Sequence, residues 1–272
     1  MITDANSHLG SIYDVEAYEH WSKHGEILER VVERYFSLRT WIDRHIVVAF
    51  PQGPHINDND CIAHFAKQHA DKVAPFLLLD PTKSSALDDI DRFIDMGAKG
   101  VHLAPIYQKF KPDEEVYFPI YEKLQKKGLP VIWFQGSSFE AVDGPMEWAN
   151  PVLLDKVARH HPELRMMIAH FGSPWFREVI ALIKKHKHVY TEMSALCFRT
   201  WALYSAMIET VQYNADEKVF FGSEFPMMTP DESREALYDI CSFGEGANLP
   251  RVPKDVVQKI MTRDVYALLG VS

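Results

Sequence analysis

Polar and ionisable side chains follow several short apolar segments of the chain, at the points where those segments end. Asp4, Asn6 and His8 lie at intervals of two near the amino terminus, and an extended strand would turn all three to the same side. His170 and Glu224 end two later apolar segments. Imidazole nitrogens and carboxylate oxygens that converge on one place can bind zinc, manganese or iron, and they also serve as general acids and bases. His8, His170 and Glu224 are therefore the first candidates for a functional site.

Further polar side chains lie at the ends of other segments, and three of them have a structural alternative to a functional role. The set consists of Asp80, His102, Glu192 and Ser194. The alternative for His102 is a hydrogen-bonded core histidine, for Asp80 a turn cap, and for Glu192 a solvated loop carboxylate. A shared functional role is the better hypothesis for the three candidates above, because all three end predicted strands.

Short apolar segments alternate with segments of helical periodicity along the whole chain. Segments that are aliphatic, β-branched and nearly continuous in hydrophobicity are typical of parallel strands covered on both faces. The predicted strands are Ile2–Asn6, His45–Phe50, Val73–Leu79, Gly100–Leu103, Pro130–Phe134, Arg165–Ala169, His188–Thr191 and Lys218–Phe221. The predicted helices lie within 27–42 and 84–97 and at Glu115–Lys127, Pro151–His160, Trp175–His186, Phe198–Tyr213, Ser233–Cys241 and Lys254–Leu269.

This order predicts a single domain, residues 1–272, with the α/β fold of a parallel (β/α)8 TIM barrel. Such barrels typically have ~250 residues, close to the 272 of this chain. A helical insertion after the first strand and a C-terminal closing helix complete the prediction. The alternative is a doubly wound open sheet, which would separate the first and eighth strands. In a barrel, the side chains at the carboxyl ends of the strands are the ones that reach a substrate.

Composition and charge are those of an ordinary soluble globular protein. Hydrophobic residues make up 47% and charged residues 25% of the chain, enough apolar material for one large core. The net charge of −9 argues against nucleic-acid binding, and no apolar run approaches the ~20 residues of a membrane helix. The three cysteines include no closely spaced pair, and the amino terminus has no secretory pattern. We expect a cytoplasmic protein with neither nucleic-acid nor membrane partners.

Seven short stretches carry a family resemblance that runs over most of the chain. They are Asp4–His8, Leu79–Pro81, Gly97–His102, Gly128–Val131, Ile168–Gly172, Val189–Ser194 and Phe220–Pro226. In this order they resemble the amidohydrolase-2 family, which includes aminocarboxymuconate-semialdehyde decarboxylase and γ-resorcylate decarboxylase. The resemblance implies a barrel that holds one divalent metal, usually zinc or manganese. It also implies a homodimer.

The same resemblance assigns the metal and the catalytic roles to particular residues. The implied metal ligands, with zinc favoured over manganese, are Asn6, His8, His170 and Glu224, and the implied catalytic residues are His170 and Glu224. Asn6 stands where the family usually has histidine, Phe134 where histidine is common, and Glu224 where aspartate is normal. Asparagine binds a metal only through a neutral carbonyl oxygen, and glutamate shifts the carboxylate by one methylene. Either the site holds metal in altered geometry, with Asp4 or His102 helping, or it is a metal-free acid–base site, as in a metal-independent lactonase of the family.

We therefore predict an enzyme, a hydrolase or a decarboxylase-like lyase, that acts on a small carboxylated or cyclic metabolite at the mouth of the barrel. The predicted substrate contacts are His102, Phe134, Gln135, Trp175 and Ser194. An apolar wall suited to a ring or alkyl group would consist of Trp133, Phe134, Phe171 and Trp175. The alternative function is a catalytically retired barrel that binds a ligand without turning it over, which Asn6 and Phe134 favour.

Overall fold

The computed structural model describes residues 1–10, 26–51, 57–138 and 141–271, and within them eight parallel strands form one sheet. The strands are β1 (Thr3–Ser7), β2 (Arg44–Val48), β3 (Val73–Leu78), β4 (Gly100–Leu103), β5 (Val131–Trp133), β6 (Met166–Ile168), β7 (Val189–Glu192) and β8 (Val219–Phe220). Each strand pairs with the next one along the chain. All eight predicted strands are present, most of them one or two residues shorter than predicted.

Hydrogen bonds between β1 and the segment around β8 close the sheet into a barrel. The Ala5 N–H donates to the Phe221 carbonyl over 2.9 Å, and the His8 N–H donates to the Phe225 carbonyl over 2.8 Å. The first and eighth strands are therefore neighbours. This confirms the (β/α)8 barrel and rules out the open doubly wound sheet.

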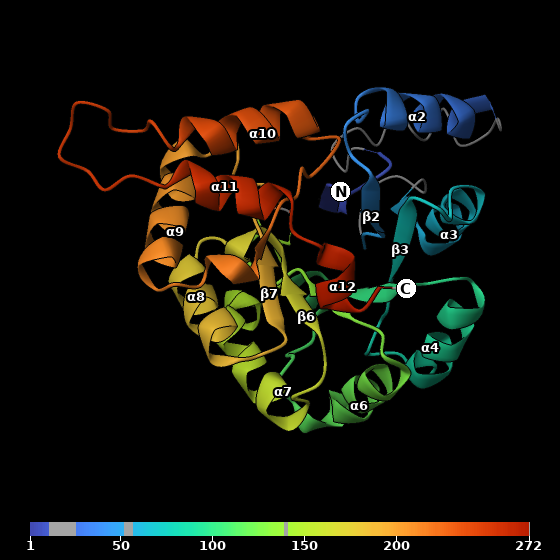
Figure 1. The fold of residues 1–272 in the computed structure, drawn as a ribbon. Coiled ribbons are helices and arrows are strands. Elements are labelled where there is room, and N and C mark those ends of the chain that lie inside the picture. The colour runs from blue at the N-terminus through green and yellow to red at the C-terminus, as the bar shows by residue number, and fades with distance from the viewer. Residues whose placement is uncertain (11–25, 52–56, 139–140, 272) are drawn as a thin grey trace.

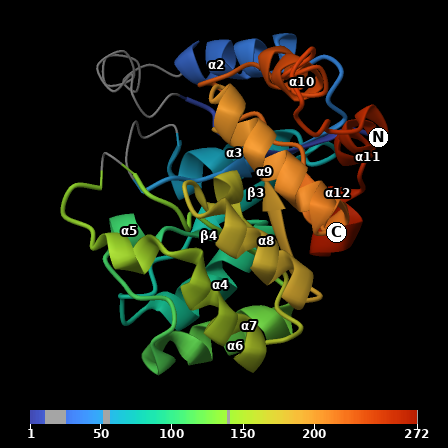
Figure 2. The same cartoon turned by 90° about the vertical axis from the view of Figure 1, so that its left-hand side faces the viewer.

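Helices connect the strands and cover the outside of the barrel (Figures 1 and 2). The α-helices are α2 (Glu26–Ser37), α3 (Asn59–Gln68), α4 (Ala86–Asp95), α5 (Pro105–Gln108), α6 (Phe118–Lys127), α7 (Leu154–His160), α8 (Phe176–Lys185), α9 (Thr200–Gln212), α10 (Pro230–Asp239), α11 (Lys254–Met261) and α12 (Val265–Leu269). The 3₁₀ helices are η2 (Glu115–Tyr117), η3 (Met146–Ala149), η4 (Pro151–Leu153), η5 (Ala169–Gly172) and η6 (Asp216–Lys218). The helix predicted within 27–42, in the connection after the first strand, is α2, which ends at Ser37.

The carboxyl-terminal segment forms two helices, α11 and α12, where the sequence predicted a single helix at Lys254–Leu269. The Asp264 side chain accepts the Ala267 N–H over 3.2 Å, and an N-cap contact of this kind starts a new helix. The hydroxyl of Tyr266 donates to the His45 carbonyl at the start of β2 over 3.2 Å. The closing helix is therefore α12 alone, and it covers the amino ends of the strands, opposite the mouth.

The apolar core has two layers, one inside the barrel and one between the strands and the helices. The inner layer includes Ile46, Phe76, Ile132, Met167 and Phe220. The outer layer is larger and includes strand residues that point the other way, such as Val47, Leu77, Val101, Trp133 and Phe221. Because the inner layer fills the barrel with side chains, a ligand site can form only at an end of the barrel.

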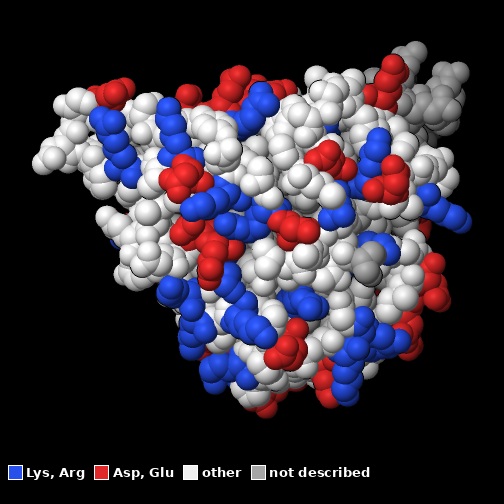
Figure 3. All heavy atoms as spheres, viewed as in Figure 1, with Lys and Arg blue, Asp and Glu red and all other residues white. Residues whose placement is uncertain are grey.

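The surface carries charges of both signs. On the face shown in Figure 3, acidic and basic side chains alternate without forming a patch of one sign. Every helix in the described part of the chain is too short or too polar to cross a bilayer.

Candidate active site

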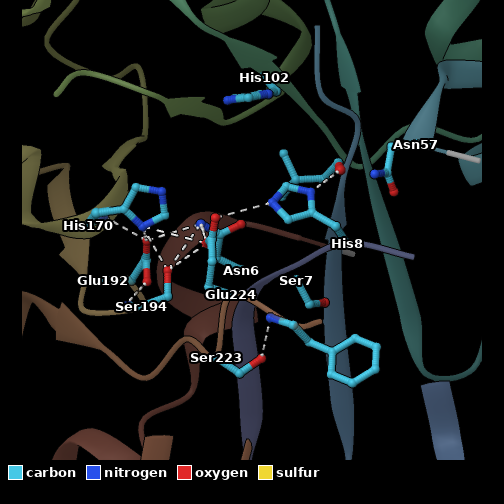
Figure 4. A network of polar contacts seen from close by, with 12 residues as sticks. Asn6, Ser7, His8, Asn57, His102, His170, Glu192, Ser194, Ser223 and Glu224 are labelled. Atoms are coloured by element: carbon cyan, nitrogen blue, oxygen red, sulfur yellow. Dashed lines mark hydrogen bonds and ion pairs between the residues drawn. The ribbon is translucent and has the colours of Figure 1, made fainter. Parts of the chain in front are cut away.

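Buried polar side chains from several strands meet at the carboxyl end of the barrel (Figure 4). This polar cluster consists of Asn6, His170, Glu192, Ser194 and Glu224, none of which is more than 9% exposed. Asn6 belongs to β1 and Glu192 ends β7, while the other three lie in the segments that follow β6, β7 and β8. Closure of the barrel thus brings the two ends of the chain into one hydrogen-bonded cluster.

Asn6 directs the nitrogen of its side-chain amide at the two carboxylates of the cluster. Its Nδ2 lies 3.1 Å from Glu192 Oε1, 3.2 Å from Glu224 Oε2 and 3.4 Å from Ser194 Oγ. Its Oδ1 is buried and has no hydrogen-bond partner among the described residues. A hydrogen-bond donor, and not an acceptor oxygen, therefore occupies the space between the carboxylates.

Glu192 is fully buried and binds the backbone of two neighbouring segments. Its Oε1 accepts the His170 N–H over 2.8 Å, and its Oε2 accepts the Ser194 N–H over 2.6 Å. The backbone after β8 passes so close that a Cβ atom on Gly222 would lie 2.4 Å from Oε2. Glycine is thus needed at this position for the close approach. Glu192 holds the cluster together, and the alternative of a solvated loop carboxylate is wrong.

His170 lies in a left-handed turn that aims its imidazole at the cluster. The backbone φ is 55° at His170 and 51° at Phe171, directly after β6. Non-glycine residues with such angles are uncommon and concentrate at functional sites. The His170 Nδ1 lies 2.8 Å from Ser194 Oγ, 3.2 Å from Glu192 Oε1 and 3.6 Å from Glu224 Oε2.

Glu224 is held by its backbone and, besides Asn6 and His170, by two further side chains. It adopts a φ of 58°, and its N–H donates to the Asn6 carbonyl over 3.0 Å. Its Oε2 accepts the Ser194 hydroxyl over 2.9 Å, and its Oε1 lies 3.6 Å from His8 Nε2. His8 Nδ1 lies 2.8 Å from the Val48 carbonyl, which can only accept, so Nδ1 carries a proton.

The charges of the cluster stabilise one another. Burial by itself lowers the pKa of an imidazole, but the carboxylates of Glu224 and Glu192 outweigh burial and raise the pKa of His170 to about 9. Burial likewise raises the pKa of a carboxyl group, but His170 and His8 outweigh it and lower the pKa of Glu224 to about 2. At neutral pH the cluster therefore contains an imidazolium beside a carboxylate.

A cavity of about 640 Å³ lies over the polar cluster, and His170 and Glu224 belong to its lining. One wall consists of Phe50, Tyr107 and Phe134, whose rings contact one another edge to face at centroid distances of 5.1 to 5.8 Å. The Phe134 ring also meets the His170 ring edge to face at 5.5 Å. An apolar wall with a few convergent polar groups is typical of a small-molecule site.

A family model described as Amidohydrolase matches residues 44–263. The chain belongs to the amidohydrolase family. The match covers most of the chain and begins after β1, so Asn6 and His8 lie outside it. It confirms the predicted family, and with it that this amidohydrolase is an enzyme of the amidohydrolase superfamily. No curated protein matches the chain.

Several solved structures have the same fold as this amidohydrolase at low sequence identity. An uncharacterised TIM-barrel protein from Bordetella bronchiseptica has a TM-score of 0.73 and 19% identity, over 99% of this chain and 98% of that chain. A probable 2-pyrone-4,6-dicarboxylic acid hydrolase from Acinetobacter baumannii, with citric acid bound, has a TM-score of 0.68 and 14% identity over 99% of both. A 5-carboxyvanillate decarboxylase from Novosphingobium aromaticivorans, complexed with manganese and 4-hydroxy-3-methoxy-5-nitrobenzoic acid, has a TM-score of 0.67 and 15% identity, over 99% and 96%.

The four metal ligands that the family resemblance implied lie close together in this amidohydrolase. Asn6, His170 and Glu224 belong to the polar cluster, and His8 borders it. Within the described residues, no group of three or more histidine, cysteine, aspartate or glutamate side chains is placed to hold a metal ion.

The predicted substrate contacts divide between the cavity and its surroundings. Phe134 lines the cavity, and Ser194 lies in the polar cluster. Trp175, like Phe134, packs against a small apolar cluster that contains Ile106 and Ala149, but it is not among the described lining residues. Of the expected apolar wall, Phe134 alone therefore faces the cavity in the described part of the chain.

His102 and Gln135 are both engaged in hydrogen bonds to the backbone. His102 Nδ1 lies 2.7 Å from the Ala49 carbonyl, and burial lowers the pKa of His102 to about 3, so its ring is neutral. His102 therefore has the geometry of a hydrogen-bonded core histidine, which is the structural alternative to a functional role for this residue. The Gln135 amide donates to the carbonyls of Trp148 and Asn150 over 2.6 and 3.1 Å. Gln135 therefore holds the loop after β5 in place through these two hydrogen bonds.

Asp4 does not share a side with Asn6 and His8, contrary to the expectation from their spacing. Asp4 pairs with His45 and Ser7 with Val47, so three steps along β1 match two steps along β2. The extra residue is a bulge, and it reverses the alternation of side chains between the two faces. Asp4 points out of the barrel, where it forms a buried ion pair with Arg39.

The Asp4–Arg39 ion pair lies outside the barrel and holds the backbone that leads to Glu224. Asp4 accepts the backbone N–H of Ser223 over 2.9 Å, directly before Glu224. The Ser223 hydroxyl also donates to Asp4. Arg39 lies in the connection between α2 and β2 and at no strand end, so no pattern in the sequence marks it as part of a site. The structure shows that it helps to fix the backbone that carries Glu224.

Proposed function

We propose that this amidohydrolase is a hydrolase or lyase that moves protons through His170, Ser194 and Glu224 on a small carboxylated or cyclic substrate. The observation that carries the proposal is the buried series of contacts from His170 Nδ1 to Ser194 Oγ at 2.8 Å and from Ser194 Oγ to Glu224 Oε2 at 2.9 Å. Its two ends belong to the lining of the cavity. A substrate in the cavity would contact both groups.

The two ends of this series have complementary roles. A charged His170 can supply a proton to an oxygen or carbon on which negative charge develops, and an ionised Glu224 can take one from an attacking water. The Ser194 hydroxyl accepts a hydrogen bond from His170 and donates one to Glu224, so it fixes the relative positions of the two side chains. Hydrolysis needs both of these transfers, whereas decarboxylation needs the proton that His170 supplies.

The choice of substrate class rests on the wall of the cavity and on the fold relatives. The three aromatic rings offer an apolar surface to a ring or an unsaturated chain. The ligands named in two of the related structures, citric acid and 4-hydroxy-3-methoxy-5-nitrobenzoic acid, are both carboxylic acids. A small carboxylated molecule therefore suits both the cavity and the fold.

The manganese of the related decarboxylase supports a divalent metal as the class of cofactor for this fold, without deciding between zinc and manganese. The donor set of this chain does not fit such an ion in the arrangement described. The Asn6 nitrogen, a donor, lies between the two carboxylates, and the His170 Nδ1 faces the same oxygens. A metal ion would have to replace both. We therefore favour the metal-free acid–base site over zinc or manganese.

The experiment is a turnover assay on a panel of cyclic esters and aromatic acids that carry a carboxylate. Wild type should convert at least one of them, and His170→Gln and Glu224→Gln should each lower the rate at least a hundredfold, within the range of general acid–base catalysis. His160→Gln serves as the control, because His160 is exposed and bonds to its own helix. Wild-type rates in both site variants would contradict the proposal, and binding without turnover would favour the retired barrel. The homodimer and the cytoplasmic location remain predictions.

A further inference from the structure

One exposed arginine lies at the rim of the cavity and forms no hydrogen bond to the polar cluster. Arg199 follows β7 in the segment before α9, and it is the one lysine or arginine among the described residues that line the cavity. Its Nη1 donates to the Ala195 carbonyl over 3.1 Å, and its guanidinium lies 4.5 Å from the centre of the Phe198 ring. Within the described residues it forms no ion pair with a carboxylate. Most of its five N–H groups are therefore available to a ligand.

A carboxylate, opposite in charge to Arg199, lies at the inner end of the cavity. Glu224 belongs to the lining of the cavity, and Glu192 lies in the polar cluster with it. A substrate carboxylate placed beside Glu224 would meet a like charge at close range in a buried setting, where Coulomb repulsion is strong. The same carboxylate at the rim would meet the charge of Arg199. A carboxylate is therefore better placed beside Arg199 than beside Glu224.

The wall between the rim and the inner end of the cavity fits this placement. Phe50, Tyr107 and Phe134 form a continuous aromatic surface in the cavity, and Phe134 reaches the His170 ring. A ring laid on this surface would have one edge near His170 and the other toward the rim. The cavity volume of about 640 Å³ is within the usual range of small-molecule sites.

We propose that Arg199 binds a carboxylate of the substrate at the rim, while the ring lies against Phe134 and the reacting atom reaches His170 and Glu224. This rests on the proposed function and narrows its substrate class to cyclic or aromatic acids whose carboxylate at Arg199 serves for recognition and is not the group that reacts. Guanidinium suits this role, because its planar N–H groups match the two oxygens of a carboxylate.

The test compares two probes of nearly equal size, benzoate and benzamide, which differ in charge. Binding to the full chain is measured by ligand-observed NMR at millimolar probe concentration for wild type, Arg199→Gln and Arg199→Lys. We expect Arg199→Gln to weaken benzoate at least tenfold, Arg199→Lys to weaken it less, and benzamide to bind all three alike. Arg251→Gln is the control, because Arg251 is exposed and is not part of the described lining. Added salt should weaken benzoate and leave benzamide unchanged.

Three results would overturn this assignment. They are benzoate binding that survives Arg199→Gln, equal weakening of benzoate and benzamide by that variant, and no benzoate binding to wild type. Each is independent of the proposed function, which is tested by turnover in the His170 and Glu224 variants. Loss of turnover in those variants together with unchanged benzoate binding in Arg199→Gln would leave the function standing and remove Arg199 from it.

Discussion

Asn6 donates its side-chain amide to Glu224 across the seam where β1 meets the segment after β8, with 3.2 Å between Nδ2 and Oε2. The same nitrogen lies 3.1 Å from Glu192 Oε1. A single amide therefore bridges two carboxylates that would otherwise repel each other. A divalent cation could perform the same task only if acceptor atoms faced it, and the nitrogen of Asn6 has no lone pair to offer.

Replacing Asn6 by histidine should change the metal content of the protein. We expect wild type incubated with zinc or manganese to retain well under one ion per chain after removal of free metal, and Asn6→His to retain more. The reason is that an imidazole can offer a lone pair next to His8 and Glu224. Elemental analysis measures the difference, and Asn248→His, at an exposed position between α10 and α11, is the control. One tightly held ion per wild-type chain would show that the metal-free interpretation is wrong.

The pair formed by His170 and Glu224 should make stability depend on pH at both extremes. The pKa of His170 rises from 6.5 to about 9 on folding, so its contribution is complete below pH 6.5 and disappears as the pH rises through 9. The pKa of Glu224 falls from 4.5 to about 2, so its contribution is complete above pH 4.5 and disappears as the pH falls toward 2. Thermal unfolding of wild type and His170→Gln measures this, and the variant should lose the alkaline dependence. Parallel curves for the two proteins would contradict the ion pair.

Gly222→Ala should disturb the site by pushing on Glu192. The added methyl group would lie 2.4 Å from Glu192 Oε2, which is fully buried and cannot move without breaking its bonds to His170 and Ser194. We expect a loss of about 1–3 kcal/mol in the free energy of unfolding, as for an overpacked core, together with reduced turnover. Gly128→Ala is the comparison, because nothing lies within 4 Å of a Cβ at that position and its cost comes from the left-handed backbone alone, with a φ of 69°. It should lower the stability without lowering turnover. Full activity in Gly222→Ala would contradict the close approach.

Asp4→Asn should destabilise the protein more than an ordinary polar substitution. Asp4 and Arg39 are at most 1% exposed, and removal of one partner leaves a buried charge without compensation. The expected loss is ~3–5 kcal/mol, measured by urea denaturation. The double variant Asp4→Asn with Arg39→Met should recover part of the stability, because no charge then remains buried. A double variant less stable than Asp4→Asn alone would argue against this account.

The contacts between Asp4 and Ser223 allow the same variants to distinguish an effect on stability from an effect on turnover. Asp4 holds the Ser223 N–H and hydroxyl, so its loss should also loosen Glu224. If the double variant regains stability but not turnover, the pair positions Glu224 as well as supporting the fold. Recovery of both together would assign the pair a purely structural role.

The sequence by itself determined the architecture and most of the residues at the mouth. Eight short apolar segments that alternate with helical segments can bury both of their faces only in a parallel sheet covered by helices, and the strand count and chain length favour a closed barrel over an open sheet. The carboxyl ends of its strands then have to meet, which brings His8, His170 and Glu224 together without further information. Ser194 could be predicted for the same reason, because it follows β7.

The tertiary structure alone decided what these residues do to one another. The bulge in β1 that turns Asp4 outward is set by pairing with β2, and a strict period of two cannot reveal it. The burial of Glu192 depends on Gly222, on the next strand segment of the barrel, and the availability of Arg199 depends on which carboxylates fold near it. Hydrogen bonds and charges act over a few ångströms in space, and spacing along the chain does not fix which groups come that close.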